Sequence, residues 1–289
     1  MKIFSRNSRL VSAGFTLIEM MVIAPIVILA IGSFIAVVVS LSGEVLSSRA
    51  SNVLAYDVQG ALNQIETDVK LSSSFLAANS ISFNATNNPQ GYGAVGSTTN
   101  FSSTGGTSGT SLILASPATN ADPLSTTARM IYLANDPNSC ATYAEYSKNE
   151  PLMTNIIYFT DSAGTLWKRT VMPYGYDNAA LRCGANTTWQ RPSCQIGYTN
   201  AFCKTNDEKL VEGVGSTGLS INYYPTADST TPSSTATSPT EATRKDALKS
   251  MQTVSVTIVA GDTIAGRDIS RSGTLRVTRL DTNASSTPL

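Results

Sequence analysis

Residues 14–41 read GFTLIEMMVIAPIVILAIGSFIAVVVSL, and this stretch decides which architecture the rest of the chain can adopt. Residues 20–41 form a run of 22 apolar or small residues without a single charge. At about 1.5 Å per residue, a helix of that length spans the roughly 30 Å hydrocarbon core of a bilayer. The sequence therefore predicts a membrane-spanning helix close to the N-terminus.

The charges around this run predict its orientation. Lys2, Arg6 and Arg9 precede it, and no acidic residue stands among them. By the positive-inside rule the N-terminus stays cytoplasmic, and everything after Leu41 lies outside. All four cysteines fall in that outer part, where an even number of cysteines indicates disulfides.

The composition argues against an enzyme. The chain of 289 residues contains no histidine, so neither a Ser-His-Asp nor a Cys-His arrangement can form within it. Asp and Glu are sparse and scattered, and the spacings of eleven and nine between Cys183, Cys194 and Cys203 do not match the closely spaced pairs of zinc sites. We predict no catalytic residues, no metal and no cofactor.

Glu19 stands at the mouth of the apolar run, which neither a plain anchor nor a secretory signal explains. A lone carboxylate in a membrane helix costs about 2–3 kcal/mol on insertion scales. Cleavage between Gly14 and Phe15 would give Phe15 a positively charged amine, one helical turn from Glu19. In a helical assembly, the amine of one subunit could then neutralise Glu19 of its neighbour.

The stretch Gly14-Phe15-Thr16-Leu17-Ile18-Glu19 resembles the class III signal of the type IV pilin superfamily. The resemblance implies that a prepilin peptidase removes a leader, residues 1–14, and methylates the new amine of Phe15. It also implies other pilin subunits as partners and a single pass through the bacterial inner membrane before assembly. The filament would be a pilus on the cell surface or a pseudopilus in the periplasm. Residues 15–44 would form the transmembrane and filament-core helix.

One position departs from the family pattern. Many major pilins carry a proline at the position of Ala36, whereas this chain has Pro25. Because proline removes a backbone hydrogen bond, we expect a bend near Met21.

The helix is predicted to continue beyond the membrane, as an amphipathic segment over residues 45–70. An apolar stripe recurs there at spacings of three and four: Leu54, Val58, Ala61, Ile65 and Val69. This stripe is expected to pack on a sheet. The fold class is therefore α+β and pilin-like, with one long N-terminal helix packed on an antiparallel β-sheet head over residues 71–289.

Strand patterns fill most of that head. They cover residues 111–116, 129–134, 155–160, 165–171, 218–224, 252–260 and 274–280. The segments 155–160 and 165–171 are expected to form a hairpin with a Gly-containing loop. Residues 97–111 and 226–243 are rich in Ser and Thr and are predicted to be surface loops.

The order of these pieces resembles the PilW minor pilins and the type II secretion pseudopilin J. The resemblance implies a minor pilin that enters or primes a type IV pilus. A pseudopilin of a secretion or DNA-uptake machine, and a tip adhesin that binds a surface ligand, are the alternatives.

Nucleic acid is not an expected partner. Without the leader, 17 basic and 20 acidic side chains remain. Four arginines do cluster near the C-terminus: Arg267, Arg271, Arg276 and Arg279. We expect them to be a solvated edge, since Arg276 and Arg279 would face opposite sides of a strand.

Cysteine spacing leaves the disulfide connectivity open. One arrangement pairs Cys194 with Cys203 and Cys140 with Cys183. The other pairs Cys183 with Cys194 and Cys140 with Cys203. Glycosylation of the head is equally undetermined by the sequence.

Overall fold

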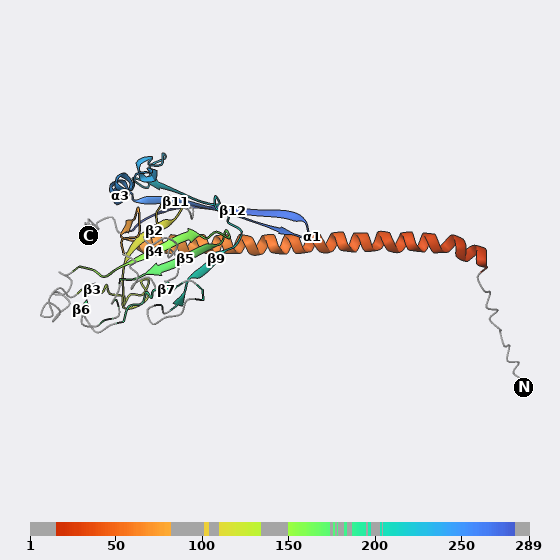
Figure 1. Ribbon diagram of the computed structural model, residues 1–289, viewed down its shortest axis with the longest axis horizontal. Coiled ribbons are helices and arrows are strands. Elements are labelled where there is room, and N and C mark those ends of the chain that lie inside the picture. The colour runs from red at the N-terminus through yellow and green to blue at the C-terminus, as the bar shows by residue number, and fades with distance from the viewer. Residues whose placement is uncertain are drawn as a thin grey trace, which may run out of the picture.

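A long helix carries a β-rich head on its C-terminal half (Figure 1). The computed structural model describes residues 16–81, 101–103, 110–133, 150–173, 176, 178, 182–183, 187–194, 196–197, 203 and 205–280.

The first element is α1, a single helix from Leu17 to Leu71. Its side chains are exposed on every side up to Ser42. Beyond that point one face becomes buried, and its members are Ser51, Leu54, Val58, Ala61, Leu62, Ile65 and Val69. The predicted apolar stripe is therefore confirmed, with Ser51 and Leu62 added to it.

Pro25 lies inside α1, where it cannot donate a hydrogen bond to the carbonyl of Met21. Figure 1 shows the helix axis turning at this N-terminal end. The position agrees with the bend expected from the sequence.

The larger sheet has five strands in the order β1-β2-β4-β5-β9, all antiparallel. These are β1 (Ser74–Phe75), β2 (Leu112–Pro117), β4 (Met153–Thr160), β5 (Leu166–Val171) and β9 (Glu208–Val211). The hairpin predicted from the sequence is β4–β5. Its turn is held by Asp161, whose Oδ1 accepts hydrogen bonds from the N–H groups of Ala163 and Thr165 at 3.0 and 2.8 Å.

The smaller sheet is the antiparallel meander β10-β11-β12. Its strands are β10 (Leu219–Tyr224), β11 (Thr253–Ile264) and β12 (Arg267–Thr278). Strands β11 and β12 are joined by Ala265 and Gly266, which both have positive φ (53° and 73°), as a two-residue hairpin turn of type I′ requires. Alternate residues of β11 are buried, so the predicted one-sided burial of this strand is confirmed.

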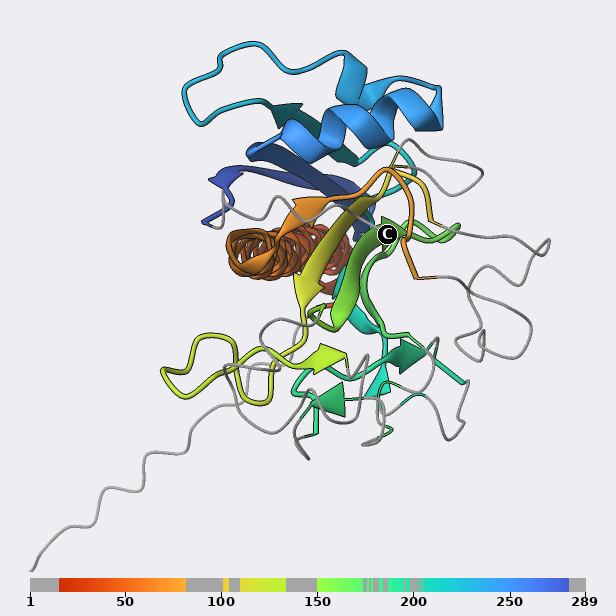
Figure 2. The ribbon, with the colours of Figure 1, turned by 90° about the vertical axis from the view of Figure 1, so that its left-hand side faces the viewer.

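Helix α1 lies in the angle between the two sheets, seen end-on in Figure 2. Its buried stripe joins the main apolar core, to which β2 contributes Leu112 and Leu114 and β11 contributes Val254, Val256 and Ile258. The five-stranded sheet is buried on its other face as well, because Ile113, Ile157 and Phe159 form a second cluster there.

The β11–β12 hairpin runs along α1 toward its apolar half (Figure 1). A Cβ atom added to Gly43 would lie 3.8 Å from Cβ of Ala265, so the tip of the hairpin reaches α1 near the end of the apolar run. Closer to the C-terminal end of α1, Gly273 of β12 packs directly against the helix. A Cβ atom there would lie 2.6 Å from Leu62 Cδ1 and 3.0 Å from Val58 Cγ1.

Short elements complete the described head. Two small sheets pair β3 (Tyr132–Leu133) with β6 (Arg182–Cys183) and, in parallel, β7 (Ser193–Cys194) with β8 (Thr205–Asn206). A 3-10 turn, η3 (Thr235–Thr237), precedes helix α3 (Glu241–Ser250). Figure 2 shows α3 on the outer side of the head, with β11 and β12 between it and α1.

Two expectations from the sequence need correction. Of the strand expected at residues 129–134, only Tyr132 and Leu133 form the strand β3, Met130 makes an isolated bridge with Thr119, and residue 134 lies outside the described residues. The loop expected at residues 226–243 is not wholly a surface loop. Ala236 of η3 is buried in the main core, and α3 begins at Glu241. Of the loop expected at 97–111, only residues 101–103, 110 and 111 are described.

Candidate functional site: the start of the apolar helix and the disulfide-bonded region

The predicted cleavage residues, Gly14 and Phe15, lie outside the described residues, as does the rest of the predicted leader. The first described residue is Thr16, which is the N-cap of α1. The helix therefore begins within the predicted motif, with Leu17 as its first residue.

Thr16 and Glu19 form a capping box. The hydroxyl oxygen of Thr16 accepts a hydrogen bond from the Glu19 N–H at 3.3 Å. In return, Oε2 of Glu19 accepts hydrogen bonds from the N–H and the hydroxyl of Thr16, both at 2.9 Å. Sequence reasoning missed this arrangement, although the Thr-x-x-Glu spacing is the signal that predicts it.

The capping box gives Glu19 a local function in the structure. Its carboxylate satisfies the backbone N–H of Thr16 at the start of α1, where a negative charge is also favoured by the helix dipole. No described lysine or arginine forms an ion pair with it. The carboxylate is thus hydrogen-bonded within its own chain but keeps an uncompensated charge at the edge of the apolar segment.

Helix α1 is long and apolar enough to cross a membrane, the only such helix in the described part of the chain. Beyond the apolar run, exposed apolar side chains continue along it. Leu46, Val53 and Tyr56 have exposed fractions of 53%, 59% and 76%. At 100° per residue, Leu46, Val53 and Tyr56 project about 80°, about 100° and about 160° away from Leu54, so they lie off the buried stripe, with Tyr56 opposite it. We call these three residues the outer apolar stripe.

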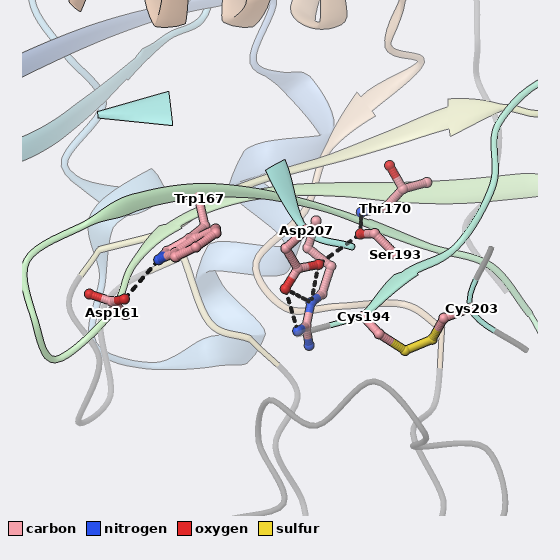
Figure 3. Close-up of polar contacts among 8 residues, drawn as sticks. Asp161, Trp167, Thr170, Ser193, Cys194, Cys203 and Asp207 are labelled. Carbon is pink, nitrogen blue, oxygen red and sulfur yellow. Dashed lines mark hydrogen bonds and ion pairs between the residues drawn. A yellow bond between two sulfur atoms is a disulfide. The ribbon is translucent and has the colours of Figure 1, made fainter. Parts of the chain in front are cut away.

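Cys194 and Cys203 form a disulfide, with Cα atoms 5.6 Å apart (Figure 3). This is the first of the two pairings left open by the sequence, and it rules out the second, in which Cys194 would bond to Cys183. Cys140 lies outside the described residues, and the side chain of Cys183 is not described. The bond between Cys140 and Cys183 therefore stays a prediction.

A buried ion pair lies beside this disulfide. The guanidinium of Arg169, on β5, donates to Asp207 Oδ2 at 2.6 Å from Nη2 and to Asp207 Oδ1 at 3.1 Å from Nε, and both side chains are fully buried. Burial raises the pKa of Asp207 above its usual range, while Arg169 and a hydrogen bond from Ser193 lower it and offset part of that shift.

This ion pair connects the disulfide-bonded region to the five-stranded sheet. Ser193 donates to Asp207 at 2.7 Å and accepts a hydrogen bond from the Thr170 N–H at 2.9 Å (Figure 3). The N–H of Asp207 donates to the carbonyl of Cys194 at 2.7 Å. The arrangement is structural support. Sequence reasoning missed it, because no local pattern connects residues 169 and 207.

The C-terminal arginines do not form one patch. Arg279 is buried and donates to the carbonyls of Ser73 and Met251. The guanidinium of Arg276 stacks 4.1 Å from the ring centroid of Tyr224, on the polar outer face of the sheet. Arg267 and Arg271 are exposed on the distal half of β12.

Among the described residues, no group of three or more His, Cys, Asp or Glu side chains could hold a metal ion. Comparison of the chain with protein-family models, with curated proteins and with solved structures finds no match.

Proposed function

We propose that this chain is a structural subunit of a filament of the type IV pilin class, most similar to a minor pilin. In this proposal a prepilin peptidase cleaves it between Gly14 and Phe15 and methylates Phe15. The mature helix then leaves the inner membrane to pack among the helices of other pilin subunits.

The observation that carries the proposal is a motif in its structural setting. The six residues from Gly14 to Glu19 run into the start of α1, whose side chains are exposed on every side up to Ser42, while the described head covers only one face of its second half. An isolated helix that is apolar all round needs lipid or other helices around it. A subunit that moves from a membrane into a helical filament meets both environments in turn.

The outer apolar stripe supports assembly rather than mere anchoring. Leu46, Val53 and Tyr56 lie beyond the residues that a bilayer core would cover, and the head leaves them exposed. A helix that served only as a membrane anchor would gain nothing from exposed apolar side chains beyond the bilayer core. Helices of neighbouring subunits would cover them.

The test is processing and assembly in cells. The chain is expressed with a prepilin peptidase and a pilus assembly system, and the membrane form and sheared filaments are sequenced from the N-terminus. The mature form should begin with a methylated Phe15, and Gly14→Val should leave the precursor in the membrane. An intact leader in chains recovered from filaments would overturn the proposal. Assembly with a secretion system instead of a pilus would assign the chain to the pseudopilins.

A further inference from the structure

We propose that the head carries a binding site for one neutral sugar ring, in a cavity beside the C-terminal end of α1. The cavity has a volume of about 250 Å³. This site does not depend on the proposed filament role, because every residue of it belongs to the head end of one chain.

The cavity is open to solvent far from the apolar segment. Its walls are the last turns of α1, strands β2, β4 and β5, and two loops around residues 122–124 and 189–190. From Leu41 to Asp68 the helix rises by about 40 Å at 1.5 Å per residue. Figure 2 views the molecule from this end, with the C-terminal end of α1 beside β2. A ligand outside the membrane would therefore have access to it.

The floor is polar, and the cavity carries a small excess of negative charge. Asp68 Oδ2 forms an ion pair with Lys168 Nζ, 2.6 Å away. The same oxygen accepts a hydrogen bond from the hydroxyl of the buried Tyr158. Asp122 adds one further carboxylate to the lining, so the cavity carries a net single negative charge. Thr67 and Ser116 also line the cavity, and because their hydroxyls donate to the carbonyls of Asn63 and Leu71, these oxygens can act toward a ligand as acceptors.

The rim is apolar and includes an exposed tryptophan. Trp189 lines the cavity with 56% of its surface exposed, and Leu124 lines it with 70% exposed. A large aromatic side chain is normally mostly buried in a monomer, and tryptophan at a surface commonly marks a binding site. The negative face of its ring attracts the slightly positive C–H groups on one face of a sugar ring.

This combination selects among ligand classes. An apolar side chain of another protein would desolvate Asp68, Lys168 and the hydroxyls without offering partners, which costs free energy. An anionic ligand would meet the excess negative charge. A neutral sugar offers C–H groups to Trp189, and its hydroxyls donate and accept at the floor. The volume lies below the roughly 300–1,000 Å³ of sites for drug-sized ligands, so a single ring is the unit that fits.

The chain provides its own reporter for a test. It contains two tryptophans, and the other one, Trp167, is only 8% exposed and donates its indole N–H to Asp161 at 2.7 Å. A change in tryptophan fluorescence on adding a sugar therefore reports mainly on Trp189. The full chain is kept in dodecylphosphocholine micelles, because detergents with sugar headgroups would compete for the site.

The probes are glucose, galactose, mannose and N-acetylglucosamine, with the anionic sugar N-acetylneuraminic acid for comparison. We expect at least one neutral sugar to shift the fluorescence with millimolar affinity and to show saturation-transfer NMR signals, while N-acetylneuraminic acid shows neither. Trp189→Ala should weaken binding at least tenfold by NMR, and Trp189→Phe should keep most of it. Val259→Ala is the control, because Val259 is an exposed apolar residue of β11 outside the cavity lining, and it should bind like the unchanged chain.

Three results would overturn the site. These are no response to any neutral sugar, equal binding by Trp189→Ala, or a response to indole compounds but not to sugars, which would indicate a peptide site instead. Failure of the filament proposal would leave these measurements unchanged, since they use the isolated chain.

Discussion

Glu19 has a local role at the start of α1, and the proposed assembly would give the same side chain an intermolecular one. Its carboxylate closes the capping box with Thr16, and its charge remains available for a partner in an assembly. These two roles can be separated, because glutamine at the same position of a capping box also accepts the hydrogen bond of the N-cap.

Glu19→Gln should keep the helix start, membrane insertion and the fold of the head, while incorporation into filaments falls greatly because the charge is lost. Glu19→Asp should be intermediate, because its shorter arm reaches a neighbouring amine less well. The measurement is the amount of subunit in sheared filaments relative to the membrane. If Glu19→Gln assembles normally and Glu19→Ala does not, the cap rather than the charge matters.

Arg169 and Asp207 allow a second test at the residue scale. Asp207→Asn leaves a charged guanidinium buried without its counterion, so we expect a loss of about 3–5 kcal/mol in the free energy of unfolding. Arg169→Met combined with Asp207→Leu removes both charges and should recover most of that loss. Urea denaturation of the full chain in micelles measures both variants. A single variant as stable as the parent would show that the pair contributes little.

At the scale of elements, the β11–β12 hairpin supports α1 along one side. The hairpin can lie close to the helix because Gly273 has no side chain where Val58 and Leu62 pack. At the tip, a Cβ atom on Gly43 would lie 3.8 Å from Ala265 Cβ, an ordinary van der Waals distance, so the contact there does not depend on glycine. The hairpin thus braces the helix from the core of the head to the edge of the apolar segment.

Gly273→Val should lower the free energy of unfolding by about 1–3 kcal/mol, because the added methyl groups overlap with Leu62 and Val58. Valine favours strands, so strand propensity cannot explain a loss. Gly60→Ala is the matched control. A Cβ atom there meets nothing within 4 Å, and the helix should gain roughly 0.5–1 kcal/mol. Thermal unfolding measures both, and equal stability of Gly273→Val and the parent would contradict the close packing.

At the scale of the whole molecule, α1 divides the chain into a part that needs an apolar environment and a part that folds around its own core. The main core joins α1 to both sheets, so the second half of the helix belongs to the head. The core contains two buried tyrosines, Tyr158 and Tyr223. Because of them, we expect the free energy of unfolding of the head to fall at alkaline pH.

Burial raises the pKa of Tyr158 well above its usual value, with a further contribution from Asp68, and burial also raises the pKa of Tyr223. Above about pH 10 the unfolded chain releases these protons while the folded head retains them. The unfolded state then binds fewer protons, so stability is complete below about pH 10 and falls as the pH rises. Thermal unfolding between pH 8 and pH 11 should show this decline.

Tyr223→Phe is the informative variant. No described residue forms a hydrogen bond with the buried Tyr223 hydroxyl, so its removal should leave stability at pH 7 equal or higher. The same variant should flatten the decline above pH 10. A pH profile identical to that of the parent would assign the decline to other groups.

The sequence by itself determined the features that repeat along the chain. The uncharged run of residues 20–41, the stripe from Leu54 to Val69 and the alternation in β11 each follow from local periodicity, because a helix or strand places successive side chains at fixed angles. The capping box at Thr16 and Glu19 is also a local feature, which the Thr-x-x-Glu spacing predicts.

Only the tertiary structure decided which distant residues meet. It paired Arg169 with Asp207, made Cys203 the partner of Cys194, buried Arg279 within the head and formed the cavity between Asp68, Lys168 and Trp189. It also buried Ala236 within a Ser/Thr-rich segment that composition alone assigns to the surface. These contacts join segments that are far apart in sequence, and their free energy depends on packing and desolvation at sites that no single segment defines.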